Sequence, residues 1–394
     1  MSDPFLEIYE AVPAWEEQFA SETADLIAGG APLLWQDIPN AKGDNPTRAH
    51  VASAVASALG MLRSWRLGGV DFAGRHWCQL PHVGCTDWDE AREAPSGFDA
   101  GLGVGSVYTP RWLADKVAEQ ALEPLVYLPG PRETGDRDAW RLRPSDEILA
   151  LRVIDIAAGA GAMLVAACRY LAERVADAWE QERGERPVGT EWEAARLVAA
   201  DCLYGVDVNP LALELAKVAI HLISHLHVRE PAAMHDHFQA TDALLGREFP
   251  QMFPDVFQDR GGFDAVIGNP PWLGGMKITG EFGTAYRDRL VKEIAYGKRG
   301  SADLSAYFVL RGWGLLNARG QLAMICTNTI AQGATHRVGL AQIVDDGDGT
   351  IMWAIKSRPW PVASVAAHYA AFSISKAPVA ADAPRFLDLG EAAA

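Results

Sequence analysis

Apolar and polar positions are arranged in blocks between residues 105 and 335, and these blocks predict strands that alternate with helices. Short apolar runs are each followed by a longer segment in which apolar residues recur at helical spacing. Such an alternation predicts a parallel sheet with helices on its faces. The strands are expected at 151–156, 203–208, 263–268 and 321–327, and the helices at 162–179, 210–228 and 302–316.

The regions outside this alternation have different patterns. Apolar positions at the start of the chain recur at helical spacing, which predicts a helical N-terminal region. Residues 180–195 are polar and are expected to form an insertion. The chain is therefore divided into a helical N-terminal region at 1–100, an α/β domain at 101–376 and a short C-terminal tail at 377–394.

The composition is that of a globular protein, and a cytoplasmic location is expected. Of the 394 residues, 49% are hydrophobic and 22% are charged. Five scattered cysteines fit a reduced compartment better than a disulfide framework. The sequence shows neither a basic, apolar leader nor an uncharged apolar run long enough to cross a bilayer.

The distribution of charge limits how the chain can meet nucleic acid. A net charge of −16 argues against the whole chain acting as a nucleic-acid clamp, because phosphate neutralisation supplies most non-specific affinity. Residues 273–300 depart from this balance, with six basic and three acidic side chains. This segment is either a solvated helix face or a local contact for phosphate.

The most informative polar motif follows the strand expected at 263–268, where the chain continues as Asn269, Pro270, Pro271 and Trp272. Two prolines fix φ and remove two backbone donors, so the loop is stiff, and the first one favours an extended backbone at the asparagine. Such a loop can accept two hydrogen bonds from one planar –NH2 group and stack on the ring that carries it. The alternative is an ordinary Pro-Pro turn with a locally packed aromatic ring.

A glycine-rich turn follows the strand expected at 151–156. Asp155 is followed by small residues and by Gly159 and Gly161, which let a ligand approach the backbone at a helix start. A dinucleotide fingerprint needs glycine where Leu164 stands, so a nicotinamide-dependent dehydrogenase is disfavoured. The Asp-x-x-x-Gly-x-Gly spacing resembles that of S-adenosylmethionine-dependent methyltransferases. The alternative is a turn that only packs a strand tightly against a helix.

Two more acids lie after the next expected strands. Asp207 ends the strand at 203–208, where a carboxylate can hold a ribose diol. Asn209 can cap the following helix, and Pro210 suits its first turn. Asp242 lies farther along, where it can bind an adenine amine or form part of a surface turn.

The segment Tyr108-Thr109-Pro110 precedes another expected helix. Thr109 is a candidate cap and Pro110 a candidate first helical residue. A helix start that faces the sheet can close over the carboxylate end of a cofactor, because helix N-termini bind anions.

In this order the motifs resemble those of the gamma class of DNA amino-methyltransferases, over roughly residues 100–376. The match continues through 301–340 and resembles the subset found in type IIG restriction–modification enzymes and phage-defence methylases. The resemblance implies an α/β, Rossmann-like S-adenosylmethionine-dependent methyltransferase with a mostly parallel, doubly wound sheet. Residues 101–376 are then the methyltransferase catalytic domain.

The resemblance also implies a reaction and a set of site residues. A methyl group would pass from S-adenosylmethionine to the N6 amine of an adenine flipped out of double-stranded DNA, without a metal ion. The Asn269 side-chain oxygen and the Pro270 carbonyl would accept the amine hydrogens, and Trp272 would stack on the ring. Catalytic roles are expected for Asn269, Pro270, Pro271 and Trp272, and cofactor binding for Tyr108, Thr109, Pro110, Asp155, Ala157, Gly159, Gly161, Asp207, Val208, Asp242 and Ala243.

The chain departs from the family pattern in two ways. Trp272 stands where tyrosine or phenylalanine is more usual. No target-recognition domain is evident after the catalytic domain, so a partner protein or a missing domain is expected to read the DNA sequence. Residues 1–100 also lack a P-D…E-x-K nuclease pattern, so no intrinsic cleavage is expected.

Other interpretations stay open at this point. The same loop can present a planar amine of an RNA guanine or a protein glutamine to the cofactor. A non-catalytic methylase-fold subunit of a defence complex is a second alternative. Two histidine-containing groups match no common metal spacing or lack a third ligand, and both are interpreted as ordinary residues; they are His76, Cys78, His82 and Cys85, and His221, His225, His227, His235 and His237.

Overall fold

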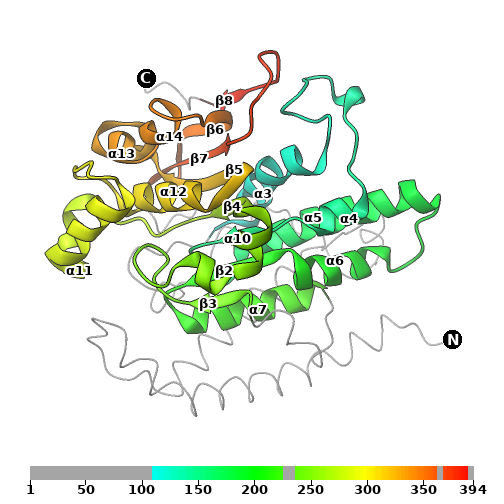
Figure 1. The fold of residues 1–394 in the computed structure, drawn as a ribbon, viewed down its shortest axis with the longest axis horizontal. Coiled ribbons are helices and arrows are strands. Elements are labelled where there is room, and N and C mark those ends of the chain that lie inside the picture. The colour runs from blue at the N-terminus through cyan, green and yellow to red at the C-terminus, as the bar shows by residue number, and fades with distance from the viewer. Residues whose placement is uncertain (1–108, 225–235, 362–366, 389–394) are drawn as a thin grey trace, which may run out of the picture. The chain divides into compact units, whose positions relative to one another are not determined.

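The computed structural model describes residues 109–224, 236–361 and 367–388 (Figure 1). The expected helical N-terminal region, Tyr108 and the cysteine–histidine group between 76 and 85 lie outside these residues. Within them, no helix is long and apolar enough to cross a membrane. The same residues contain no group of three His, Cys, Asp or Glu side chains arranged to hold a metal ion.

One eight-stranded sheet, in the order β3-β2-β1-β4-β5-β7-β6-β8, is formed by the described part of the chain. The first five strands in this order, from β3 through β2, β1 and β4 to β5, are parallel to one another. Strand β7 is antiparallel to both β5 and β6. The mostly parallel α/β sheet expected from the sequence is therefore confirmed. The strands are β1 (Val153–Asp155), β2 (Leu203–Asp207), β3 (Phe238–Ala240), β4 (Phe263–Gly268), β5 (Leu316–Thr327), β6 (Thr350–Pro359), β7 (His368–Ser375) and β8 (Phe386–Asp388).

Helices cover the sheet in two layers. The chain moves one way along the sheet from β1 to β3 and the other way from β4 to β5, so right-handed crossovers place the connecting helices on opposite faces. In one layer, α5 packs against both α3 and α7. In the other layer, α12 packs on β4 and β5. The longer helices are α3 (Arg111–Val126), α5 (Ala162–Arg183), α6 (Thr190–Asp201), α7 (Pro210–Ser224), α11 (Gly275–Arg289) and α12 (Leu304–Leu315).

Shorter helical turns complete the described chain. They lie mainly in the connections between the sheet strands and the longer helices. These turns are α4 (Ser145–Leu149), α9 (Phe249–Met252), α10 (Pro254–Arg260), α13 (Gly333–Val338), α14 (Ala341–Val344), η3 (Arg137–Ala139), η4 (Leu290–Ile294) and η5 (Asn328–Ala331).

The expected elements agree with the structure to different degrees. The strand expected at 263–268 is β4 with the same bounds, because its apolar run is short and uninterrupted. The polar segment 180–195 contains the end of α5 and the start of α6, and it is stabilised by ion pairs of Arg186 with Asp177 and Glu191. Strands β3, β6, β7 and β8 were not among the expected strands, and β8 extends the sheet into the segment interpreted as a tail.

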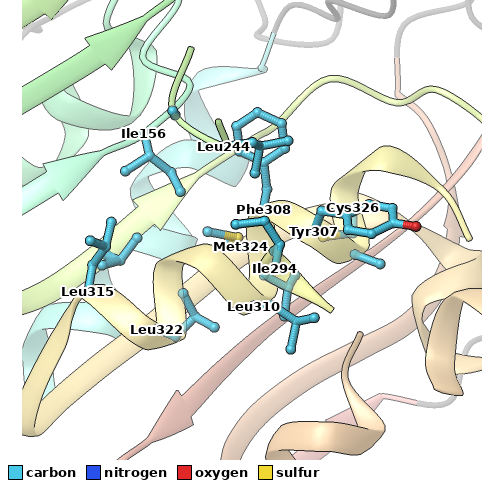
Figure 2. Packing of buried hydrophobic residues seen from close by; sticks show 14 of the residues in the cluster. Ile156, Leu244, Ile294, Tyr307, Phe308, Leu310, Leu315, Leu322, Met324 and Cys326 are labelled. Carbon is cyan, nitrogen blue, oxygen red and sulfur yellow. The ribbon is translucent and has the colours of Figure 1, made fainter. Parts of the chain in front are cut away.

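The hydrophobic core that supports the sheet edge lies under α12. Figure 2 shows Leu310 and Leu315 of this helix meeting Leu322 and Met324 of β5 in one buried cluster. A Cβ atom on Gly312 would lie 2.8 Å from the Met324 Cε atom, so glycine lets the helix approach the strand closely. Each fully buried leucine of this kind stabilises the fold by about 1.5–3 kcal/mol.

Candidate functional site

The polar motifs expected from the sequence meet along one edge of the sheet. Strands β3, β2, β1 and β4 are parallel neighbours, so their carboxyl ends lie side by side. Asp242, Asp207, Asp155 and Asn269 lie at or just beyond these ends, in this order along the edge. Three strand spacings of about 4.8 Å place the two outer groups roughly 14 Å apart.

Thr109 and Asn269 are brought together from distant parts of the chain. The Asn269 Nδ2 atom donates a hydrogen bond of 3.0 Å to the Thr109 Oγ1 atom, across a sequence separation of 160 residues. Thr109 is 5% exposed. The start of α3 therefore lies beside the loop that follows β4, as expected for a helix that closes over the sheet edge.

The expected capping role of Thr109 is corrected by the structure. Helix α3 begins at Arg111 with Pro110 in the N-cap position, and no side chain caps the helix. The Thr109 hydroxyl bonds Asn269 instead. A one-residue shift of a helix start is within the usual uncertainty of sequence patterns.

Trp272 belongs to an aromatic group that the sequence analysis did not foresee. Its ring meets the Trp360 ring edge-on, with centroids 4.7 Å apart and an interplanar angle of 85°. Trp360, at the end of β6, meets Tyr369 of β7 edge-on at 5.5 Å. The indole Nε1 atoms of both tryptophans are buried and have no hydrogen-bond partner among the described residues. Only the pairing of β6 with β7 brings Trp360 to this place, so no local signal pointed to it.

The two glycines of the turn after β1 have different surroundings. Gly161 has a φ of 87°, and a Cβ atom there would lie 2.9 Å from the Ala216 Cα atom of α7. Gly159 has a φ of 52°, and among the described residues only the Ala157 carbonyl oxygen lies near its Cβ position, at 4.0 Å. Gly161 thus serves helix packing, whereas Gly159 faces space that no other described residue fills and that a ligand can enter.

Asp155 is enclosed beneath this turn. Its side chain is 1% exposed, and its Oδ1 atom accepts a 2.9 Å hydrogen bond from the Ala157 N–H group. Burial raises the pKa of Asp155 to about 8, and the neighbouring Asp207 carboxylate adds to the shift. A Cβ atom on Gly268 would lie 3.0 Å from the same Oδ1 atom, so a side chain at the end of β4 would crowd this carboxyl group.

Asp207 ties the ends of β1 and β2 together. Its Oδ2 atom accepts a 2.9 Å hydrogen bond from the Gly159 N–H group, and its Oδ1 atom one of 2.8 Å from the Asn209 N–H group. Burial raises the pKa of Asp207, whereas these backbone donors lower it. The expected roles of Asn209 and Pro210 are confirmed, because Asn209 Oδ1 accepts from Ala212 N–H at 3.4 Å and α7 begins at Pro210.

Val208 and Ala243 flank the two acids differently. Val208, directly after β2, is 58% exposed. Ala243 is buried beside Asp242. An exposed apolar side chain next to Asp207 offers a flat ligand a surface at the sheet edge.

Asp242 is bonded on both carboxylate oxygens. Its Oδ1 atom accepts from the Leu244 N–H group at 2.8 Å, and its Oδ2 atom accepts from the Tyr286 hydroxyl at 2.9 Å. Tyr286 lies in α11, which begins just beyond the Asn-Pro-Pro-Trp loop. Sequence reasoning missed Tyr286, because its separation from Asp242 hides the contact.

The basic segment 273–300 is largely paired within the chain. Arg289 bonds Glu293, Lys298 bonds Asp346, and Arg299 bonds Asp288. Arg287 donates to the Gly300 carbonyl oxygen at 3.1 Å. These contacts favour the solvated helix face over a dedicated phosphate contact for four of the six cations.

Comparison with known proteins adds a family match and a shared fold. Residues 201–344 match the family model of the Eco57I restriction-modification methylase. This range includes Asp207, Asp242 and the loop from Asn269 to Trp272. No curated protein matches the chain.

Three similar solved structures come from restriction–modification systems or DNA complexes. The DrdV–DNA complex has a TM-score of 0.52 at 12% identity, and the match covers 99% of this chain and 44% of the DrdV chain. The ATP-dependent Type ISP restriction-modification enzyme LlaBIII bound to DNA has a TM-score of 0.50 at 12% identity, covering 95% and 26%. The type I methyltransferase subunit from Streptococcus thermophilus has a TM-score of 0.41 at 16% identity, covering 86% and 57%.

These comparisons establish the fold. At 12% identity the DrdV and LlaBIII likenesses show a shared architecture, and this chain spans 44% and 26% of those two proteins. With its sheet order, the architecture of the described residues is a Rossmann-like, mostly parallel α/β sheet. S-adenosylmethionine is accordingly the expected cofactor of a chain that matches a restriction-modification methylase model over residues 201–344.

Proposed function

We propose that this chain is a DNA methyltransferase that methylates the N6 amine of adenine in double-stranded DNA, within a restriction–modification or phage-defence system. The observation that carries the proposal is the order of groups along the carboxyl edge of the sheet. Asp242 and Asp207 lie at one end, the open side of Gly159 lies between, and the Asn269 loop lies at the other end. A donor and an acceptor of a methyl group need this arrangement of two adjoining sites.

The cofactor side fits S-adenosylmethionine, which when bound supplies a methyl group activated by its sulfonium. The Asp207 oxygens accept the N–H groups of Gly159 and Asn209, and because an ionised carboxylate has about four lone-pair sites, it can also accept a ribose hydroxyl. Val208 presents apolar surface for a purine face. Gly159 leaves room for close approach to the backbone. In this proposal Asp242 accepts the purine amine, and Thr109 and Pro110 lie at the end nearest the target base.

The base side would hold a flipped adenine. Asn269 and the Pro270 carbonyl accept the two amine hydrogens, and Pro271 keeps the loop stiff. Trp272 stacks on the ring, which is worth about 1–3 kcal/mol for a nucleobase. The buried indole N–H groups of Trp272 and Trp360 support a ligand here, because unpaired buried donors are rare in folded proteins.

Catalysis in this arrangement is positioning. Two acceptors fixed on a stiff loop direct the amine nitrogen toward the methyl donor, which removes the entropic cost of alignment. The same dipoles stabilise the positive charge that develops on the nitrogen. Sequence recognition is assigned to a partner protein or a further domain, in keeping with the greater length of DrdV and LlaBIII, whose solved structures contain DNA.

The decisive experiment measures methyl transfer by the full chain. Radiolabelled S-adenosylmethionine is offered with unmethylated genomic DNA, total RNA or a protein extract, with neighbouring gene products present and absent. The expected product is N6-methyladenine in DNA, identified by mass spectrometry of nucleosides. An Asn269→Ala protein prepared in the same way controls for a contaminating enzyme. Label in RNA or protein alone, or no transfer to DNA under any condition, would refute the proposal.

A further inference from the structure

The turn that carries Asp242 is held by groups from outside its own strand. Within the turn, the Asp242 Oδ1 atom accepts from the N–H groups of Leu244 at 2.8 Å and Leu245 at 3.3 Å. That oxygen is thus used by the local backbone. The Oδ2 atom is the one available for contacts beyond the turn, and it accepts from the Tyr286 hydroxyl at 2.9 Å.

Two arginines fix the backbone of the same turn. Arg311 of α12 donates from Nε to the Ala243 carbonyl oxygen at 3.1 Å, and Arg289 of α11 donates to the Leu245 carbonyl oxygen at 3.4 Å. The Leu244 side chain is 3% exposed and lies in the core cluster with Phe308, as Figure 2 shows. The turn therefore has little freedom, and the direction of the Asp242 carboxylate depends on Tyr286, the side chain that bonds its outer oxygen in the described part of the chain.

The Tyr286 hydroxyl acts as a donor in this contact. Burial raises the pKa of Tyr286 well above its usual range, and the Asp242 carboxylate raises it further. The phenol therefore keeps its proton at any working pH. A phenol O–H group occupies one lone pair of Oδ2, and the second lone pair stays available to another donor.

We propose that Tyr286 is a positioning residue that directs Asp242 toward the exocyclic amine of the cofactor's adenine. The inference rests on the proposed function, because it takes an adenosyl cofactor at the edge formed by β1, β2 and β3. The Asp242 carboxylate then selects a ring that donates at this position over one that accepts there. A hypoxanthine ring, which carries a carbonyl in place of the amine, is the matched negative ligand.

The test compares two ligands that differ at the purine 6-position and at the adjacent N1, which accepts a hydrogen bond in adenine and carries a proton in hypoxanthine. Binding of S-adenosylhomocysteine and S-inosylhomocysteine to the full chain is measured by titration calorimetry. Tyr286→Phe is expected to raise the Kd for the adenosyl ligand about three- to tenfold and to leave the Kd for the inosyl ligand nearly unchanged. The ratio of the two Kd values falls by the same factor, while kcat at saturating S-adenosylmethionine is retained.

A matched control and a second variant isolate the effect. Tyr296→Phe removes the same hydroxyl from a residue that is 74% exposed, and both Kd values should stay at those of the unsubstituted chain. In an Asp242→Asn background, Tyr286→Phe should add no further loss, because its effect passes through the carboxylate.

The outcomes separate this inference from the proposed function. Unchanged or tighter adenosyl binding by Tyr286→Phe overturns the inference, since tighter binding means that Tyr286 competes with the amine. Equal weakening of both ligands also overturns it, because a loosened fold has no preference between them. If the unsubstituted chain binds neither ligand, the proposed cofactor site itself is refuted together with the inference.

Discussion

At the end of the sheet edge near β3, β2 and β1, each acid is anchored in its own turn, and two of the three acids also have a distant partner. At the β4 end the polar and aromatic groups have only distant partners among the described contacts. Asp155, Asp207 and Asp242 each accept a hydrogen bond from the N–H group two residues farther along the chain. Asn269 is bonded to a residue 160 positions away, and Trp272 contacts Trp360 across strands. The comparison shows a cofactor side that combines local turns with long-range bonds to Asp207 and Asp242, beside a base side assembled by tertiary contacts.

This difference has a physical consequence for how the two sides respond to change. Local turns form with little loss of chain entropy, so each acid on the cofactor side keeps a local anchor in addition to its tertiary contacts. The base side depends on the correct placement of α3 and of the β6–β7 hairpin. Substitutions on the two sides should therefore affect cofactor binding and methyl transfer separately, and the following predictions use that separation.

The largest expected effect is on the base side. Asn269→Ala removes one acceptor of the target amine and should lower kcat by about 10²–10³-fold, the size seen when one fixed polar group is removed from a reacting centre. Binding of S-adenosylmethionine should change less than twofold, as measured by calorimetry. Methyl transfer at the rate of the unsubstituted chain would disprove the role of Asn269. A large loss of cofactor binding would disprove the separation of the two sides.

The two glycines of the turn after β1 should respond in different ways. Gly161→Ala combines a left-handed backbone with a 2.9 Å contact to Ala216 and should cost roughly 2–5 kcal/mol of unfolding free energy. Gly159→Ala meets open space and should cost roughly 1–2 kcal/mol through its φ alone. Its methyl group should instead raise the Kd for S-adenosylmethionine by about tenfold or more.

Chemical denaturation and calorimetry distinguish these two results. Each glycine serves as the control for the other, since both lie in the same turn and receive the same methyl group. Equal losses of stability, or full cofactor affinity in Gly159→Ala, would show that the space beside Gly159 does not receive the ligand.

A smaller effect is expected at Trp360. Trp360→Leu removes the aromatic edge that faces Trp272 and should raise the KM for DNA about three- to tenfold, in line with the worth of an aromatic pair. The Kd for S-adenosylmethionine should stay constant. Trp179→Leu, which removes a buried indole from α5, is the control for lost packing and should leave the KM for DNA unchanged. A KM for DNA equal to that of the unsubstituted chain would show that Trp360 does not contribute to the base side.

A further effect is expected on the pH dependence of stability. Burial raises the pKa of Asp155 to about 8, above that of an unfolded aspartate. The folded state thus binds more protons between about pH 4 and pH 8, so this carboxyl group makes stability fall as pH rises through that window. Asp155→Asn keeps an acceptor for Ala157 and should flatten the slope of Tm against pH between 5 and 8. A slope as steep as that of the unsubstituted chain would contradict the shift.

The parts that could be predicted from sequence are those with local causes. β4 was expected with its observed bounds because a short apolar run ends at Gly268 and two prolines. The caps at Asn209 and Pro210 follow from side-chain chemistry within a few residues. The roles of the acids in binding a cofactor stay predictions that rest on the proposed function.

The contacts that could not be predicted depend on long-range packing. Thr109 was expected to cap a helix. Instead, α3 begins beside the loop after β4, and the Thr109 hydroxyl accepts a hydrogen bond from Asn269. Neither Trp360 nor Tyr286 had a local sequence signal. The pairing of β6 with β7 brings Trp360 to the sheet edge, and α11 brings Tyr286 there. The sequence does not distinguish Gly159 from Gly161. The structure does, because α7 places Ala216 against Gly161 and not against Gly159.

The sequence by itself determined which groups stand at the carboxyl end of each strand, because apolar periodicity, proline and glycine act within a few residues. Only the tertiary structure decided which of those groups face one another. That choice is made by the strand order and by the packing of α3, α7, α11 and the β6–β7 hairpin, where the burial of apolar surface outweighs local preference.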